Sequence, residues 1–344
     1  MKRLVFLFFM LLVAGTTFAQ KVNLKAVTEK LKAGQLPVAQ DFGFTEYQIP
    51  VDQDTVFFYT YQKPGTQPNA VYITLPGSNA ENIYTWHNAG RSEFWFNSLT
   101  DFDFSYLPDN YLLVIVAKPG FGFCGKSDED HIPEKYWKYT SLDDRVFRAN
   151  LALEYAKKHL VKNPKKVVAF GYSEGFYVGA KLAVVNKSIT HLGIGGGGGY
   201  IDFYDFILEN QKTGLKNQAD PDTIISWSRS IIETFQQIMA DPDSREMTYG
   251  YSNKRWASFA EPPVKNLTTL NIPIFQVHGT EDDMTPVESA YIVPLEFARL
   301  KKSNLTFKLY ARCDHSLVEK TPDGKEIEHK GEMMNAFFRW VDEH

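Results

Sequence analysis

The chain has 344 residues, of which 44% are hydrophobic and 23% charged. This composition is typical of a folded protein with a sizeable core, and it excludes a disordered chain, a collagen-like repeat and a multispan membrane protein. The net charge of −4 argues against nucleic acid or an anionic membrane surface as the main partner. Aromatic residues make up 15% of the chain, an excess that needs a location in the fold.

The first residues predict a secretory signal peptide. Basic Lys2 and Arg3 precede an apolar run over residues 4–14, and small residues then lead to Ala19. The apolar run is too short to span about 30 Å of hydrocarbon at about 1.5 Å per residue. We therefore expect residues 1–19 to be removed, leaving a periplasmic or secreted protein without stable membrane insertion. Loss of Lys2 and Arg3 would change the net charge to −6.

The pattern after this leader predicts an α/β protein. After a helical entry at 22–32, residues 45–51 and 55–61 alternate like an antiparallel pair. Short apolar runs, each bounded by turn residues, indicate buried parallel strands at 70–75, 111–117, 166–170, 189–194, 272–277 and 306–310. Helical periodicity occupies 142–160, 174–185, 287–300 and 328–343. Strands alternating with helices predict a mostly parallel sheet with helices on both faces, in a single domain over residues 20–344.

One stretch interrupts this alternation. Residues 200–263 show helical patterning at 223–239, no predicted strand and a concentration of aromatic residues. We interpret the stretch as a helical cap inserted between two strands. Three aromatic residues of the cap are candidates for a substrate pocket: Tyr200, Trp227 and Trp256. Asn79 and Tyr172, near the predicted strand ends, are further candidates.

The main chemical motif is G-x-S-x-G around Ser173. The run from Gly171 to Gly175 follows a predicted strand and precedes a predicted helix, which is the context of a nucleophile elbow. The sharp turn holds the serine in an unfavourable backbone conformation, and the flanking glycines avoid collisions that a Cβ would cause. The helix N-terminus then directs its dipole at the reacting centre.

A serine nucleophile needs a base, and the base needs a carboxylate to orient it. Strand 272–277 runs into His278, Gly279 and the carboxylates Asp282 and Asp283, and strand 306–310 runs into a loop containing His315. Both loops follow strand C-termini, where such sheets place their sites. The chain order serine, aspartate, histidine is the order that G-x-S-x-G hydrolases use.

With these three motifs the sequence resembles the α/β-hydrolase superfamily over residues 44–340. The resemblance implies Ser173 as nucleophile, His315 as base and Asp282 as the orienting acid, with Asp283 as the alternative. It also implies an oxyanion hole made of the Glu174 amide and one amide from the loop at 75–79. Ser78 is the expected second donor and Asn79 the alternative.

The remaining motifs carry less chemistry. The glycine-rich loop at 118–127 lacks the spacing of a phosphate-binding loop. Two cysteines are too few for a zinc site, and the acidic run 128–131 is read as solvated, so we expect neither metal nor cofactor. The resemblance places Cys124 and Cys313 near the same sheet edge, where they could form a disulfide in an oxidising compartment.

The expected function is that of a serine hydrolase acting on a carboxylic ester, or an amide, through an acyl-enzyme. The substrate would be a small-molecule ester or a short peptide. Two alternatives stay open: a peptidase of the prolyl-oligopeptidase type, which the run around Ser173 also resembles, and a catalytically silent protein of hydrolase fold that binds a ligand.

Overall fold

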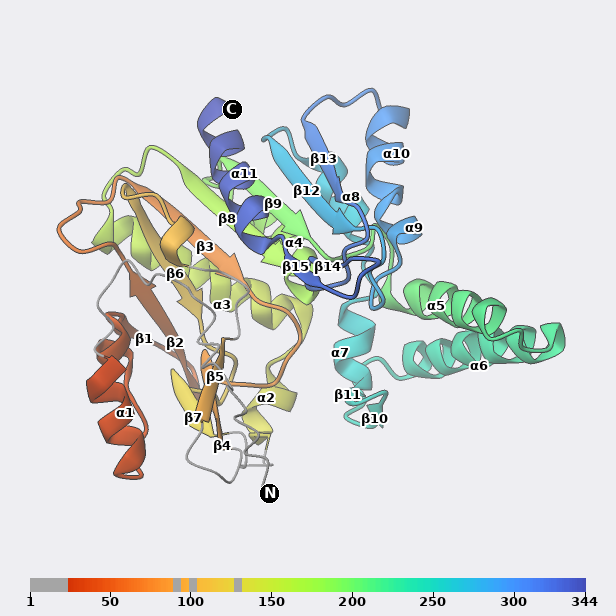
Figure 1. The fold of residues 1–344 in the computed structure, drawn as a ribbon, viewed down its shortest axis with the longest axis horizontal. Helices are drawn as coiled ribbons and strands as arrows, with labels where there is room; N and C mark the ends of the chain where they lie inside the picture. Colours follow the sequence, from red (N-terminus) through yellow and green to blue (C-terminus); the bar gives the residue numbers. More distant parts are fainter. Residues whose placement is uncertain (1–23, 89–93, 99–103, 127–131) are drawn as a thin grey trace, which may run out of the picture.

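The computed structural model describes residues 24–88, 94–98, 104–126 and 132–344. The predicted leader, 1–19, lies outside these ranges. The main sheet has eight strands in the order β1-β2-β6-β3-β8-β9-β12-β13 (Figure 1). Their bounds are Thr45–Val51, Asp54–Tyr61, Tyr111–Val116, Ala70–Leu75, Val167–Tyr172, His191–Gly195, Ile274–Gly279 and Leu305–Tyr310.

The strand directions confirm the predicted fold class. β1, β2 and β6 pair antiparallel, and every pair from β6 to β13 is parallel. All residues of β3, β8, β9 and β12 are buried. This is why these strands read as continuous apolar runs, since a parallel sheet is covered on both faces.

Helices form a layer on each face of the sheet (Figure 1). One face is covered by α3, α4, α8 and α10, which span Leu142–Tyr155, Glu174–Val185, Pro263–Thr269 and Ile292–Arg299. The other face packs against α1, the 3-10 helix η1 and α11, which span Leu24–Lys32, Ala39–Phe42 and Lys330–Glu343. Three short helices lie in the connections: η2 (Phe104–Tyr106), α2 (Glu134–Lys138) and α9 (Val287–Ala290).

Two predicted helices are not regular α-helices over their whole length. The helix expected at 142–160 is α3 followed by a π-helical turn, η3, over Ala156–Leu160. The helix expected at 287–300 is broken into α9 and α10 at Tyr291. Pro294 explains this break, because it has no amide hydrogen for the carbonyl of Ala290 and its ring would collide with that carbonyl. The buried amide of Gln276 donates to the Ala290 carbonyl instead, at 3.1 Å.

The sequence did not predict two small sheets. β4 (Tyr84–Asn88) lies between β5 (Phe94–Ser98) and β7 (Cys124–Lys126), and β14 (Val318–Lys320) pairs with β15 (Glu326–Glu328). In the first sheet Tyr84 is the partner of Cys124, forty residues further along the chain. β7, β14 and β15 have three residues each, which is too few to show a period of two.

The predicted cap lies between β9 and α8. It contains α5 (Asp202–Lys216), α6 (Pro221–Ala240), β10 (Met247–Thr248), β11 (Tyr251–Ser252) and α7 (Asn253–Ser258). The expectation that it has no strand is wrong, since β10 and β11 form a two-residue antiparallel pair. The cap has a small core of its own, made of Ile201, Phe203, Ile231, Ile238 and Trp256.

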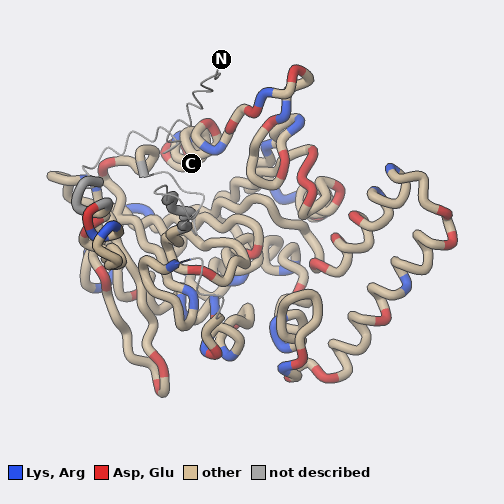
Figure 2. Tube along the Cα trace, turned by 60° about the horizontal axis from the view of Figure 1, so that its bottom comes forward, with Lys and Arg blue, Asp and Glu red and all other residues tan. Residues whose placement is uncertain are grey.

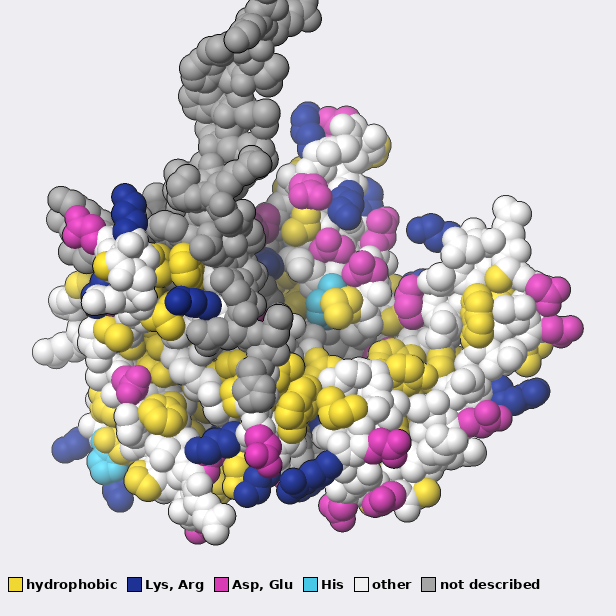
Figure 3. Space-filling model, turned by 90° about the horizontal axis from the view of Figure 1, so that it is seen from below, with side chains coloured by type: hydrophobic (Ala, Val, Ile, Leu, Met, Phe, Trp, Pro, Cys, Tyr) yellow, Lys and Arg dark blue, Asp and Glu magenta, His cyan; other side chains and the backbone are white. Residues whose placement is uncertain are grey.

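The α5–α6 hairpin projects away from the main sheet (Figure 1). Acidic and basic positions are interspersed along it and along the rest of the trace (Figure 2). From below, the hairpin and the main body enclose a hollow in which hydrophobic side chains are visible (Figure 3). In the part of the chain that the structure describes, no helix combines the length and apolarity needed to cross a membrane.

Close packing at β9 predicts the cost of one methyl group. A Cβ added at Gly193 would lie 2.3 Å from Phe170 Cδ2 and 2.6 Å from Phe337 Cε2. We expect Gly193→Ala to lower the free energy of unfolding by about 1 to 3 kcal/mol, as overpacking does. Gly122→Ala is the control, because its Cβ would meet only Asn82, at 3.9 Å. Equal denaturant midpoints for the two variants would contradict this account.

Candidate active site

Ser173 lies on a strained turn between β8 and α4. Its φ is 56° and its ψ −124°, a region that costs a residue with a side chain about 1 to 3 kcal/mol. The flanking glycines have no room for a Cβ. One added at Gly171 would lie 1.9 Å from the carbonyl oxygen of Gly175, and one added at Gly175 would lie 1.9 Å from that of Leu75. The turn therefore depends on the G-x-S-x-G pattern for steric reasons.

An aspartate and a histidine lie close together at the ends of β12 and β13. Asp282 is buried, and its carboxylate oxygens lie 2.9 and 3.0 Å from Nδ1 of His315. Oδ1 of Asp282 also accepts hydrogen bonds from the amides of Met284 at 2.9 Å and Thr285 at 2.8 Å. Asp283 is exposed. Of the two adjacent aspartates, Asp282 is the one that contacts the histidine.

The loop that contains His315 contacts Tyr172, the residue before Ser173. The hydroxyl of Tyr172 donates to the carbonyl oxygen of His315 at 2.8 Å, and the two rings meet edge to face with centroids 5.7 Å apart. The amide of Ser173 is held by the carbonyl of Gly195 at the end of β9, at 2.9 Å. Ser173, Asp282 and His315 thus share the edge formed by the C-terminal ends of β8, β12 and β13.

A second histidine supports the acid loop. His278 is fully buried at the end of β12, and its Nε2 lies 2.8 Å from the carbonyl of Thr285 and 3.4 Å from Oδ2 of Asp282. Burial lowers the pKa of His278, against the opposing effect of the Asp282 carboxylate. The ring is therefore neutral near pH 7, and Nε2 carries the hydrogen donated to Thr285.

The loop after β3 lies beside Ser173. A Cβ built on Gly77 would lie 3.3 Å from Cβ and 3.6 Å from Oγ of Ser173. Ser78 and Asn79, the two candidate oxyanion donors, follow directly. The side chain of Asn79 donates to Glu81 Oε1 at 2.9 Å.

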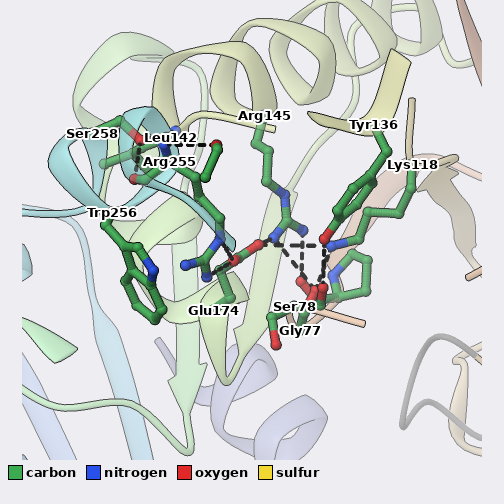
Figure 4. Close-up of polar contacts among 12 residues, drawn as sticks. Gly77, Ser78, Lys118, Tyr136, Leu142, Arg145, Glu174, Arg255, Trp256 and Ser258 are labelled. Carbon is green, nitrogen blue, oxygen red and sulfur yellow. Dashed lines mark hydrogen bonds and ion pairs between the residues drawn. The ribbon is translucent and has the colours of Figure 1, made fainter. Parts of the chain in front are cut away.

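A buried cluster of charges, which the sequence did not reveal, surrounds the side chain of Glu174. Its carboxylate forms ion pairs with Arg145 of α3 and Arg255 of α7, and it lies 3.7 Å from Nζ of Lys118 (Figure 4). All these side chains are at most 7% exposed. Because the cationic residues are far apart in sequence, no local motif signals the cluster.

The candidate pocket residues fall into different environments. Tyr172 is beside His315, as described above. Tyr200 and Trp227 of the cap are 44% and 43% exposed. Trp256 is 5% exposed, donates its indole hydrogen to the carbonyl of Thr248 at 2.7 Å, and packs within the core of the cap. Its surroundings are those of a structural residue rather than of an open pocket.

Cys124 and Cys313 are free thiols in this structure, so the considered disulfide is not formed. Cys124 begins β7 in the three-stranded sheet. Cys313 is buried, and its backbone forms an isolated antiparallel β-bridge with that of Glu319. Burial raises the pKa of Cys124 to about 12 and that of Cys313 to about 11, which disfavours the reactive thiolates.

No metal centre is found among the residues that the structure describes: they contain no group of three or more His, Cys, Asp or Glu side chains placed to hold an ion. The acidic run 128–131 lies outside the described ranges.

Neither a known protein family nor a curated protein matches the sequence. Solved structures do match. An esterase from an Arctic intertidal metagenomic library is 12% identical with a TM-score of 0.50, over 87% of this chain and 93% of the esterase. The acylaminoacyl peptidase of Pyrococcus horikoshii is 8% identical with a TM-score of 0.53, over 87% of this chain and 41% of the peptidase.

A second acylaminoacyl peptidase structure, bound to a chloromethyl ketone, is 11% identical with a TM-score of 0.51, over 91% of this chain and 43% of its own. The chain thus spans about two fifths of the length of these peptidases. Together with the order and direction of the eight strands, these likenesses show that the chain has the α/β-hydrolase fold.

Proposed function

We propose that the protein is a serine hydrolase that cleaves a carboxylic ester through an acyl-enzyme on Ser173. The observation that carries the proposal is the strained turn at Ser173 on the same sheet edge as the contact between Asp282 and His315. A positive φ at a serine is costly, and such strain persists where the surrounding structure requires it, commonly at active sites.

Each residue has one role in the proposed reaction. Ser173 Oγ attacks the carbonyl carbon while His315 Nε2 accepts the hydroxyl proton. Asp282 accepts the hydrogen of Nδ1, which selects the tautomer with a free Nε2 and stabilises the imidazolium. The amides of Glu174 and Ser78 bind the oxyanion, with Asn79 as the alternative second donor.

The protonated histidine then returns its proton to the leaving oxygen, and the alcohol departs. In the second half-reaction His315 takes a proton from water, whose oxygen attacks the acyl carbon. Collapse of that intermediate releases the acid and restores the Ser173 hydroxyl. The polypeptide alone supplies the groups for this cycle.

A peptidase is the second candidate, because two of the matched structures are acylaminoacyl peptidases. We favour the ester, since its leaving oxygen demands less protonation than an amide nitrogen does. A silent binding protein of the same fold is the third candidate. On the strength of the basic, apolar and small-residue zones of residues 1–19, we further propose that the protein is exported.

We expect a fluorophosphonate probe to label the wild type and not Ser173→Ala, because labelling needs an activated serine. The same substitution should lower kcat by about 10⁶-fold, the loss typical of removing a triad nucleophile. Ser230→Ala, an exposed serine of α6, serves as the matched control and should label like the wild type. Absence of wild-type labelling between pH 6 and pH 9 would favour the silent binder.

The two neighbouring aspartates should differ sharply. Asp282→Asn should lower kcat by about 10⁴-fold, because the amide no longer selects the productive tautomer of His315. Asp283→Asn changes an exposed side chain and should stay near the wild-type rate. Steady-state hydrolysis of a p-nitrophenyl ester measures both. If Asp283→Asn proves damaging and Asp282→Asn mild, the acid is wrongly assigned.

Substrate class can be read from a panel of p-nitrophenyl esters of rising acyl length, set beside aryl-sugar esters and aminoacyl p-nitroanilides. We expect kcat/KM for the alkyl esters to exceed that for the anilides and to rise with acyl length, because the hollow beside the cap shows hydrophobic side chains (Figure 3). Faster cleavage of the anilides would instead support the peptidase.

A further inference from the structure

We infer that Lys118, Tyr136 and Arg145 are positioning residues of the oxyanion hole. They hold the backbone carbonyls of residues 76–78 from behind, and so set the direction of the amides on the opposite side of the loop. This inference rests on the proposed function, because it assigns these residues a role in stabilising the oxyanion formed at Ser173.

Three successive carbonyls of the loop after β3 each accept a hydrogen bond from a different buried side chain (Figure 4). The contacts are Arg145 Nη2 to the Pro76 oxygen at 2.7 Å, Lys118 Nζ to the Gly77 oxygen at 2.6 Å and the Tyr136 hydroxyl to the Ser78 oxygen at 2.8 Å. The donors come from the loop that follows β6, from α2 and from α3. A loop with no regular structure is therefore held at three consecutive peptide groups.

Peptide geometry turns these contacts into a direction for the amides. In the described chain no peptide bond is cis, and in a planar trans peptide the N–H points opposite to the C=O. Holding the Gly77 carbonyl at Lys118 therefore aims the Ser78 amide away from the cluster. Holding the Ser78 carbonyl at Tyr136 does the same for the amide of Asn79. Both candidate donors are thus fixed by side chains behind the loop.

The same cluster also contacts Glu174, whose amide is the first proposed donor of the oxyanion hole. Glu174 begins α4, so its amide is the proposed first donor, and its carboxylate is paired with Arg145. Arg145 thus contacts both the Pro76 carbonyl and the residue that follows the nucleophile. Arg255 binds Glu174 from the cap, with Nε 2.9 Å from Oε2, and so connects the base of the cap to the hole.

Stability alone is a poor explanation for this cluster. Burial lowers the pKa of Arg145 to about 10, and it lowers the pKa of Lys118 well below its ordinary value, helped by repulsion from Arg145 and Arg255. Burying several cations around one carboxylate costs desolvation that their attraction barely repays, and apolar side chains of similar size often stabilise a core equally well. Apolar side chains could not donate the directional hydrogen bonds that these residues make to the loop.

The test removes one hydroxyl. Tyr136→Phe deletes the donor to the Ser78 carbonyl and keeps the ring, while Tyr111→Phe deletes a similarly buried hydroxyl at the start of β6, away from the site. With p-nitrophenyl acetate we expect Tyr136→Phe to lower kcat about 10-fold with KM unchanged, less than the loss of a hole donor itself. We expect Tyr111→Phe to match the wild type.

A transition-state readout separates positioning from general damage. Phenylboronic acid forms a tetrahedral adduct with the serine, so its inhibition constant for Tyr136→Phe should rise by the same factor as kcat/KM falls. Lys118→Met provides a second variant, and it should lower kcat without a lower melting temperature because it also removes an unfavourable buried amine.

The outcomes distinguish the two proposals. If the wild type hydrolyses the ester and both Tyr136→Phe and Lys118→Met match Tyr111→Phe in kcat and in inhibition by phenylboronic acid, the positioning role is wrong and the serine hydrolase stands. A wild type that neither hydrolyses esters nor labels with fluorophosphonate would overturn both.

Discussion

The positive φ of Ser173 is the constraint on which the rest of the site depends. A backbone that turns this sharply brings α4 so close to β3 that Gly175 nearly touches the carbonyl of Leu75. The strand before the turn must lie in the middle of the sheet, where neighbours on both sides hold it, and β8 does lie between β3 and β9. The same close approach brings the loop after β3 alongside Ser173. One strained turn thus places the Ser173 hydroxyl at the end of β8 and the loop after β3 next to it.

The turn sets where the loop after β3 lies, but not how its peptide groups are oriented. A loop that passes within a few ångströms of the nucleophile could present carbonyls or amides to the substrate, with opposite effects on a developing negative charge. The side chains of Lys118, Tyr136 and Arg145 decide this by attracting the carbonyls to the far side. The direction of the peptide dipoles in this loop therefore depends on donors that are buried behind it.

Local signals in the sequence predicted the main elements. The buried strands and the run from Gly171 to Gly175 were visible because each depends on neighbouring residues, through hydrophobic runs and steric demands within one turn. The cluster around Glu174 was not visible, since Lys118, Arg145 and Arg255 come together only when β6, α3 and α7 pack. The break at Tyr291 had a local signal in Pro294, which periodicity alone overlooked. The β4–β7 pair was likewise not visible, because it joins residues forty apart in the sequence.

The two ends of the cap differ in burial and in the contacts they make. Its base, through Arg255, is tied to the carboxylate of Glu174 beside the nucleophile, and Trp256 packs next to that arginine in the core of the cap. Its outer part, the α5–α6 hairpin, leaves Leu215 and Ile225 more than half exposed. A buried, fully packed base is costly to alter, whereas exposed positions tolerate substitution. The hairpin can therefore be substituted at little cost in stability, whereas the buried pair of Arg255 and Glu174 fixes the base of the cap against α4.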